Sequence, residues 1–447
     1  MRKTINKLFL IITVISALLL TTGCDLFIKT NKGQVDQKWY MGLTYEDDNG
    51  NDTDYTIETD GTIAAVALED GYGDEFGIIK GEEAYLNINT IIKNIDKRFY
   101  VDTTNNLVMF TDATKTYKTK IGGKTINETE NTDYVISFMD GKNCYVNVKF
   151  VKKYVDFDYK VVKAEGKSPA RIVLKYTSGE KNQMTVKSNI EMRTKADYQN
   201  LIVTTLKKNT KVTVLEESGE WTKVGTDDGF IGYVPAKKLK DKETKKTDFK
   251  SDADTYTHVL MDKKISLGWN AITNLTANGN LETIIEHTKG LNVISPTWYS
   301  LSDNKGNLRS YASATYVEKA HSKGLKVWAL VNDFGTQDKA SKEYTKKVLT
   351  DTTKRENLVD NIMTNIKDYN LDGINIDFEF INKDIINSYL QFLRELSIEC
   401  RKAGKVLSID NYVPSSGSEY YDIAHQSLVA DYIIIMSYDE HYAGSKE

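Results

Sequence analysis

The sequence predicts an α/β protein, with a C-terminal domain of repeated βα units after two smaller β-rich modules. From about residue 257 onward, apolar strand-like runs alternate with amphipathic helical patterns, which is typical of a parallel sheet covered by helices. Residues 36–178 and 184–240 show short strands separated by turn signals instead. A chain of 447 residues that is 40% hydrophobic and 27% charged is long enough for several such domains.

The composition excludes two classes of function. The 59 basic and 63 acidic residues give a net charge of −4, which offers no field to attract a polyanion, so nucleic acid is not an expected partner. Three cysteines without a C-x-x-C pair and five scattered histidines lack the spacing of metal ligands. We therefore expect neither a metal site nor a cofactor.

Residues 1–24 have the pattern of an export signal, with basic residues near the start and an apolar run over 8–20. The Gly-Cys pair that ends at Cys24 resembles a bacterial lipobox, which implies lipidation of Cys24. Thr21 stands where lipoboxes usually have Leu, so an ordinary signal peptide or an uncleaved anchor is the alternative. We expect an extracytoplasmic protein, either a membrane-anchored lipoprotein or a secreted protein associated with the cell wall.

The module over 36–178 combines short strand patterns with turns, for example the apolar run 107–110 after two asparagines. The stretches 84–88 and 100–102 distantly resemble stalk-like domains of exported cell-wall proteins. No site residue is expected in this module.

The module over 184–240 predicts a small β-barrel. Its strand-like stretches follow one another at short intervals, separated by Gly and Asp turns, at 190–194, 211–215, 221–224 and 230–235. The combination of R-T, W-x-K-V and G-x-x-G-Y-V segments resembles the bacterial SH3-like domain, which implies binding to the cell wall. Trp221 and Tyr233 are either part of a binding surface or part of the barrel core. The lysine-rich residues 241–256 are predicted to form a solvated linker.

Six strands are expected in the C-terminal domain, over 257–447. They are Ile265–Trp269, Leu291–Ser295, Leu325–Val331, Gly373–Glu379, Val406–Asp410 and Asp431–Asp439. Between them, one helical stripe is formed by Leu358, Ile362, Ile366 and Tyr369, and two helices end at Gly324 and Gly404.

The fourth of these strands carries the most informative motif in the chain. Side chains alternate along a strand, so Asn375, Asp377 and Glu379 share one face, opposite to a face of apolar residues. A strand buried on both sides should be apolar throughout, because an unpaired buried charge costs several kcal/mol. Two carboxylates and an amide in one row therefore indicate a functional site, rather than the polar face of an exposed edge strand.

This strand, read as D-G-x-x-x-D-x-E, resembles glycoside hydrolase family 18. The sixth strand strengthens the resemblance, because Met436, Tyr438 and Asp439 match the M-x-Y-D of that family. The resemblance implies a (β/α)8 TIM barrel and a retaining hydrolysis in which the acetamido oxygen of the substrate replaces an enzyme nucleophile.

The resemblance also implies a role for each matching residue. Glu379 would protonate the glycosidic oxygen, Asp377 would orient the acetamido group and stabilise its charge, and Tyr438 would hydrogen-bond the acetamido oxygen. The residues expected to contact the sugar are Asn375, Met436, Asp439, Trp269 and Trp298.

One position departs from the pattern of many chitinases, which have Asp where this chain has Asn375. An amide cannot hold a charge, so Asp377 is expected to stay ionised over a wider pH range. We expect the substitution Asn375→Asp to shift the acidic limb of the rate–pH profile. An Asn here is similar to the branch of the family that acts on bacterial cell wall and spore cortex.

The leading functional hypothesis is a glycosidase that cleaves β-1,4 linkages of N-acetylglucosamine-containing glycans, either peptidoglycan or chitin. The alternatives are a non-catalytic glycan-binding protein of the cell wall and a purely structural surface protein. Glu379 favours the enzyme, because lectin-like members of the family commonly lack it. About 190 residues follow the small modules, whereas the barrel typically needs about 250, so we expect the barrel to stop after its sixth strand and the chain alone to be inactive.

Overall fold

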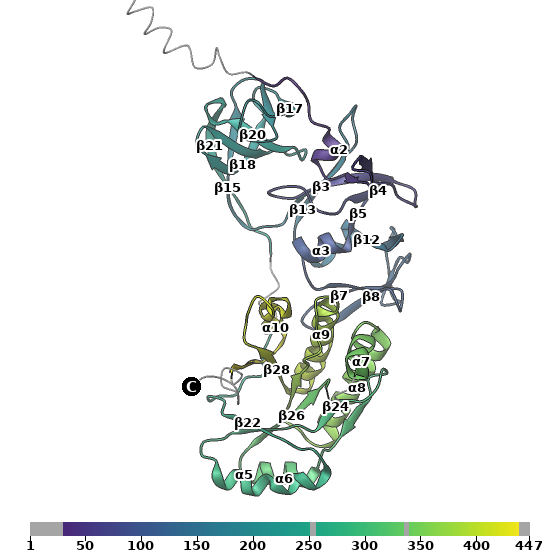
Figure 1. Cartoon of the computed structure of the whole chain (residues 1–447), viewed down its shortest axis with the longest axis vertical. Helices are drawn as coiled ribbons and strands as arrows, with labels where there is room; N and C mark the ends of the chain where they lie inside the picture. The colour runs from purple at the N-terminus through teal and green to yellow at the C-terminus, as the bar shows by residue number, and fades with distance from the viewer. Residues whose placement is uncertain (1–29, 251–255, 335–338, 438–447) are drawn as a thin grey trace, which may run out of the picture. The chain divides into compact units, whose positions relative to one another are not determined.

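The computed structural model describes residues 30–250, 256–334 and 339–437 (Figure 1). Its contacts define two compact units. Unit 1 contains the chain up to Thr90 together with Val151–Lys250, and unit 2 contains Ile91–Phe150 together with the chain from Ser251 onward. The module predicted over 36–178 is thus divided between the two units. The chain passes from one unit to the other within the helices α3 (Ile88–Asn94) and α4 (Val148–Tyr154).

The first part of unit 1 is a sheet in which the strands lie in the order β5-β4-β3-β14-β13. Neighbouring strands are antiparallel except β3 and β14, which are parallel. A short helix and a hairpin, β1–β2, precede the sheet. The bounds are α2 Gln37–Tyr40, β1 Thr44–Glu46, β2 Asp52–Asp54, β3 Thr62–Ala67, β4 Gly77–Lys80, β5 Glu83–Asn87, β13 Asp158–Val162 and β14 Ala170–Lys175.

The second part of unit 1 is a small antiparallel β-structure with the strand order β17-β16-β20-β19-β18-β15-β21. The bounds are β15 Gly179–Val186, β16 Ile190–Arg193, β17 Ile202–Leu206, β18 Lys211–Ser218, β19 Trp221–Gly225, β20 Ile231–Pro235, η1 Ala236–Lys238 and β21 Leu239–Thr247. Trp221 is buried and packs edge-on against Tyr198, with 4.8 Å between the ring centroids. Of the two sequence alternatives, Trp221 therefore belongs to the core, while Tyr233 is half-buried.

Residues 241–247, which the lysine-rich composition predicted to be a linker, form most of strand β21 instead. The backbone of β21 pairs antiparallel with β15, from Gly179 opposite Thr247 to Val186 opposite Leu239. Its side chains are mostly exposed. An edge strand needs a backbone partner rather than apolar side chains, and lysines are common on such edges, so composition alone could not reveal it.

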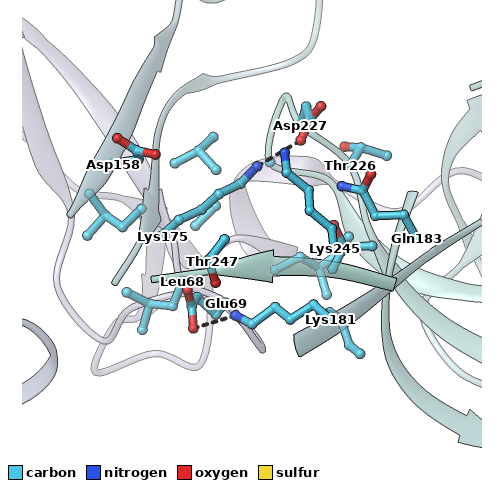
Figure 2. A pocket seen from close by; sticks show the side chains of 18 residues that line it. Leu68, Glu69, Asp158, Lys175, Lys181, Gln183, Thr226, Asp227, Lys245 and Thr247 are labelled. Atoms are coloured by element: carbon cyan, nitrogen blue, oxygen red, sulfur yellow. Dashed lines mark hydrogen bonds and ion pairs between the residues drawn. The ribbon is translucent and has the colours of Figure 1, made fainter. Parts of the chain in front are cut away.

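A cavity of about 190 Å³ lies within unit 1 (Figure 2). Residues of β14, β15 and the β19–β20 turn contribute to its lining. Two ion pairs stand on its walls, Lys181 with Glu69 at 2.7 Å and Lys175 with Asp227 at 2.9 Å. The charges of these four residues are thus mutually neutralised.

Unit 2 begins with a β-meander in the order β10-β9-β8-β7-β6 and the hairpin β11–β12. The bounds are β6 Phe99–Asp102, β7 Leu107–Thr111, β8 Thr116–Lys120, β9 Thr125–Ile126, β10 Glu130–Asn131, β11 Ser137–Asp140 and β12 Asn143–Asn147. The meander packs on the helices of the α/β domain. Asp102 accepts hydrogen bonds from both the backbone nitrogen and the hydroxyl of Thr352, each at 2.6 Å, and Tyr100 bonds Ser388 at 2.9 Å.

The α/β domain is built on six parallel strands in the order β22-β23-β26-β27-β28-β29. The bounds are β22 Leu267–Asn270, η3 Leu275–Asn280, α5 Leu281–His287, β23 Val293–Pro296, β24 Tyr299–Leu301, β25 Leu308–Ser310, α6 Ala314–Ser322, β26 Lys326–Asn332, α7 Lys339–Leu349, α8 Thr352–Asp368, β27 Gly373–Asp377, α9 Ile386–Ala403, β28 Val406–Tyr412, η4 Glu419–Tyr421, α10 Ile423–Val429 and β29 Tyr432–Met436. The six strands predicted from apolar runs are confirmed, with ends that differ by a few residues.

Two helices of this domain end close to the predicted glycines, α6 at Ser322 shortly before Gly324 and α9 at Ala403 directly before Gly404. Asp351 caps the N-terminus of α8 by accepting hydrogen bonds from the backbone nitrogens of Thr353 and Lys354. Of the predicted stripe, Leu358, Ile362 and Ile366 lie in the main core, while Tyr369 caps the C-terminus of α8 and packs against that core partly buried. Helix α9, which packs beside α8 (Figure 1), ends at Gly404 in a left-handed conformation with φ of 62°.

Within the described ranges, none of the helices is both long and apolar enough to cross a membrane. The predicted export signal, with Cys24, lies outside the described residues.

Candidate active site

The centre of the site is the row of polar side chains on β27. Asn375 and Asp377 are buried, and Glu379 follows the strand and is partly exposed. The alternate residues Ile374 and Ile376 belong to the main core cluster. The alternation read from the sequence therefore places polar groups on the inner side of the sheet and apolar groups under the helices.

Glu379 is held by two neighbouring strands. Its backbone nitrogen donates to Asp333, which directly follows β26, at 2.9 Å, and the backbone nitrogen of Phe380 donates to the same carboxylate at 3.1 Å. From β28, the hydroxyl of Tyr412 donates to Oε2 of Glu379 at 2.7 Å. Because Asp333 also accepts from the hydroxyl of Thr345 at 3.0 Å, both the backbone and the carboxylate of Glu379 are fixed.

Asn375 connects three strands through its amide. Its Oδ1 accepts hydrogen bonds from the indole nitrogen of Trp269 at 3.0 Å and from the hydroxyl of Ser295 at 3.3 Å. Its Nδ2 donates to Oδ1 of Asp410 on β28 at 2.9 Å. An indole nitrogen can only donate, so the Trp269 contact determines which end of the amide points to Asp410.

The buried carboxyls of the site have strongly shifted acidities. Burial, and then the charges of Asp410, Glu379 and Asp333, raise the pKa of Asp377 to about 8. Burial, followed by the charge of Glu379, raises the pKa of Asp410 to about 7. Burial raises the pKa of Asp333 to about 6 despite its hydrogen bonds.

These pKa values correct one sequence prediction. Asp377 was expected to stay ionised over a wide pH range, because Asn375 replaces a second acid on the same strand. The prediction is wrong, since the neighbouring strand β28 brings Asp410 beside Asp377 and both carboxyls are buried. The second acid is present, but on another strand.

The two tryptophans predicted to contact sugar differ. Trp269 is 37% exposed and donates from its indole nitrogen to Asn375. Trp298 is fully buried, donates to Asn278 at 2.8 Å and packs edge-on against Tyr316. Its predicted stacking role is wrong, because the chain between β23 and β24 turns the indole into the core.

Of the predicted residues on the sixth strand, Met436 is buried at the end of β29, where it is opposite Tyr412 on β28. Tyr438 and Asp439 lie outside the described residues.

Sequence reasoning missed three contributors to this site, Asp333, Asp410 and Tyr412. The sequence contained a signal for two of them. Asp410 and Tyr412 stand two positions apart in an apolar strand and therefore share one face of it, as the polar residues of β27 do. Asp333 follows an apolar strand directly, at the position of a strand end. In the part of the chain that the structure describes, no three His, Cys, Asp or Glu side chains are grouped to hold a metal ion.

Comparison with protein families agrees with this geometry. Residues 230–446 match the model of glycosyl hydrolases family 18. The chain contains a glycosyl hydrolase family 18 domain. Residues 188–240 match the bacterial SH3 domain. The six-stranded sheet with its helices is thus the TIM-barrel-like sheet of the family 18 domain, and β16–β20 belong to the SH3 domain.

Two proteins of Bacillus subtilis (strain 168) are similar to parts of this chain. YdhD, a candidate sporulation-specific glycosylase, is 35% identical over 112 residues, which are 24% of this chain and 26% of YdhD. The uncharacterised glycosylase YvbX is 26% identical over 165 residues, which are 34% of this chain and 46% of YvbX. The chain thus matches between a quarter and a half of the length of these relatives.

Among solved structures, that of YdhD is 27% identical, with a TM-score of 0.32 over 34% of this chain and 52% of that chain. The spore cortex-lytic enzyme SleL of Bacillus cereus is 20% identical, with a TM-score of 0.36 over 41% of this chain and 43% of that chain.

Proposed function

We propose that the protein is an extracytoplasmic glycosidase that hydrolyses β-1,4 linkages of N-acetylglucosamine-containing glycans, with peptidoglycan as the principal substrate. The observation that carries the proposal is the Glu379 carboxylate, which is fixed by Tyr412 and Asp333 beside the buried Asp377. The family 18 match and the glycosylase relatives give the reaction class.

In this proposal Glu379 is the general acid. Tyr412 occupies Oε2, so Oε1 is the oxygen that can deliver a proton to the glycosidic oxygen. The carboxylate that remains keeps the hydrogen bond from Tyr412, which is stronger to a charged acceptor than to a neutral one. Tyr412 thus stabilises Glu379 after it has given up its proton.

Asp377 acts on the other side of the sugar. Deep in the sheet and next to Glu379, it would hold the nitrogen of the acetamido group while the acetamido oxygen attacks the anomeric carbon. Positive charge then develops on the acetamido group, and an adjacent carboxylate stabilises it. The configuration at the anomeric carbon is retained because the acetamido oxygen and then water attack in succession.

Peptidoglycan is favoured over chitin by the SH3 domain in the same chain. Such a domain would keep the enzyme on the cell wall, so its weak binding adds to that of the catalytic domain. Deleting residues 184–240 is not a clean test, because β15 in unit 1 pairs with both β18 and β21.

The test compares the full-length protein with its Glu379→Gln variant on purified peptidoglycan and on chitin oligosaccharides. Reducing ends and the masses of the products are measured. Glu419→Gln, which changes an exposed carboxylate of the same domain, is the control. We expect Glu379→Gln to lose at least a thousandfold in kcat and the control to remain active.

Two outcomes would contradict the proposal. An active Glu379→Gln variant would exclude this residue as the acid. A wild-type protein that sediments with cell wall and releases no reducing ends would support the alternative of a non-catalytic glycan-binding protein.

A further inference from the structure

Asp410 is a second buried carboxyl of the site. Among the described residues, neither a hydrogen bond to the backbone nor an ion pair accounts for its burial. It is 3% exposed, and among the described residues its side chain accepts hydrogen bonds from Asn375, at Oδ1, and from Trp269. Its other oxygen, Oδ2, has no hydrogen-bond partner among the described residues, and the same is true of Oδ1 of Asp377. A buried carboxylate oxygen without a donor is costly, so a bound proton is expected there.

The register of the sheet brings these two carboxyls together. Strands β27 and β28 are parallel, with Ile376 opposite Ile409, so the next pair along the strands is Asp377 and Asp410. Neighbouring strands lie about 4.8 Å apart, so two aspartate side chains on the same face of adjacent strands can bring their carboxyl groups together. Among the charged groups that raise the pKa of Asp377, Asp410 contributes most.

Asn375 determines which oxygen of Asp410 carries the proton. Trp269 and Ser295 both donate to Oδ1 of Asn375, so the amide must present its NH₂ group to Asp410. Oδ1 of Asp410 is therefore an acceptor and holds no proton, which leaves Oδ2 as the protonated oxygen. An aspartate at position 375 could donate in this way only if it were itself protonated.

We propose that Asp410 is a positioning residue that shares one proton with Asp377, and that Asn375 orients Asp410 for this exchange. The proposal rests on the proposed function, because Asp410 acts through Asp377. With the proton on Asp410, Asp377 is an anion that can stabilise the acetamido charge; with the proton on Asp377, it is neutral. The pair carries one negative charge in both forms, so the exchange needs no further reactant.

The other groups around the pair cannot take this role. Asp333 accepts two backbone hydrogen bonds and one from Thr345, and Glu379 accepts from Tyr412. The titratable and charged groups that face the pair within the described residues are Asp333, Glu379, Tyr389, Tyr412 and Tyr421. The three tyrosines have pKa values raised by burial, so they remain neutral.

The test uses two variants of the full-length protein, Asp410→Asn and the exchange Asn375→Asp/Asp410→Asn, with Glu419→Gln as the control. The exchange places the acid on β27 and keeps one amide and one acid. We expect Asp410→Asn to lower kcat at least tenfold with KM changed less than threefold, and to shift a limb of the kcat–pH profile by at least one pH unit. The exchange should recover most of both effects, which a purely structural role of Asp410 would not allow.

A titration that does not depend on activity separates this proposal from the proposed function. Carboxyl carbons of aspartate are followed by NMR against pH in Glu379→Gln and in the same protein with Asp410→Asn. We expect Asp410→Asn to lower the titration midpoint of Asp377 by at least one pH unit.

Each outcome then decides one question. An unchanged midpoint for Asp377 overturns the proposal, whatever the activity. A pH profile that is unchanged in Asp410→Asn, in an enzyme that Glu379→Gln inactivates, overturns the proposal and leaves the proposed function in place. Wild-type protein without activity, together with a shifted Asp377 midpoint, removes the proposed function and retains the shared proton. If Asp410→Asn fails to fold, a folded and inactive exchange variant overturns the proposal.

Discussion

Replacing Asp377 by Asn should make the protein more stable at pH 8 than at pH 5, relative to wild type, while removing activity. The pKa of the folded carboxyl is about 8, raised first by burial, whereas its ordinary value is 3.8. A folded pKa above the unfolded value means that the stabilising contribution is fully present below about pH 4 and is lost as the pH rises through about 8. The variant has no such group, so it avoids the loss.

The size of this effect follows from the pH interval. Between pH 5 and pH 8 the folded carboxyl keeps the proton that the unfolded chain has already released, and each pH unit is worth about 1.4 kcal/mol. The difference in unfolding free energy between Asp377→Asn and wild type should therefore grow over these three pH units, by at most about 4 kcal/mol because Asp410 stays in the variant and can keep a proton.

Urea denaturation of both proteins at pH 5, 6.5 and 8, followed by tryptophan fluorescence and circular dichroism, measures this difference. The control Glu419→Gln changes an exposed carboxylate, so its unfolding free energy should vary with pH as that of the wild type does. Stability curves for Asp377→Asn and wild type that stay parallel within 1 kcal/mol would refute the burial of an unpaired carboxyl at this position.

Three further substitutions test single contacts. Tyr412→Phe removes the 2.7 Å hydrogen bond to Glu379; at about 1.5–3 kcal/mol for a bond to a charged group, kcat should fall roughly ten- to hundredfold with KM nearly constant, and an unchanged kcat would exclude this support. Asp102→Ala removes two hydrogen bonds from Thr352 and should lower stability by about 2–3 kcal/mol, seen as a lower urea midpoint; an equal midpoint would contradict the packing of β6 on α8. Gly404→Ala places a side chain at φ of 62° in open space and should cost about 1 kcal/mol, whereas a gain in thermal stability would argue against the left-handed helix end.

Much of the α/β domain could be predicted because its signals are local. An apolar run predicts a buried strand, a glycine after an apolar stripe predicts a helix end, and both occur at α9 and Gly404. The row of Asn375, Asp377 and Glu379 is equally local, because alternation along one strand places all three on one face.

The features that were missed depend on neighbours that are distant in sequence. Asp410 matters because β28 lies next to β27 in one register, which no single strand reveals. Trp298 follows a strand, as a sugar-stacking residue would, and the direction of its indole is decided by the turn into β24. Strand β21 was hidden because its pairing with β15 uses backbone groups, about which lysine-rich composition says nothing.

The hydrogen bonds between Asp102 and Thr352 have a consequence for the order of synthesis. They join positions 250 residues apart in the chain, and at 5–20 residues per second a ribosome needs on the order of 10–50 s to make the intervening segment. The meander β6–β10 is therefore made early and must wait for α8 and α9 before its buried polar groups are satisfied. A fragment that starts at residue 257 would leave the backs of these helices uncovered, so an expressible catalytic fragment should include residues 91–150.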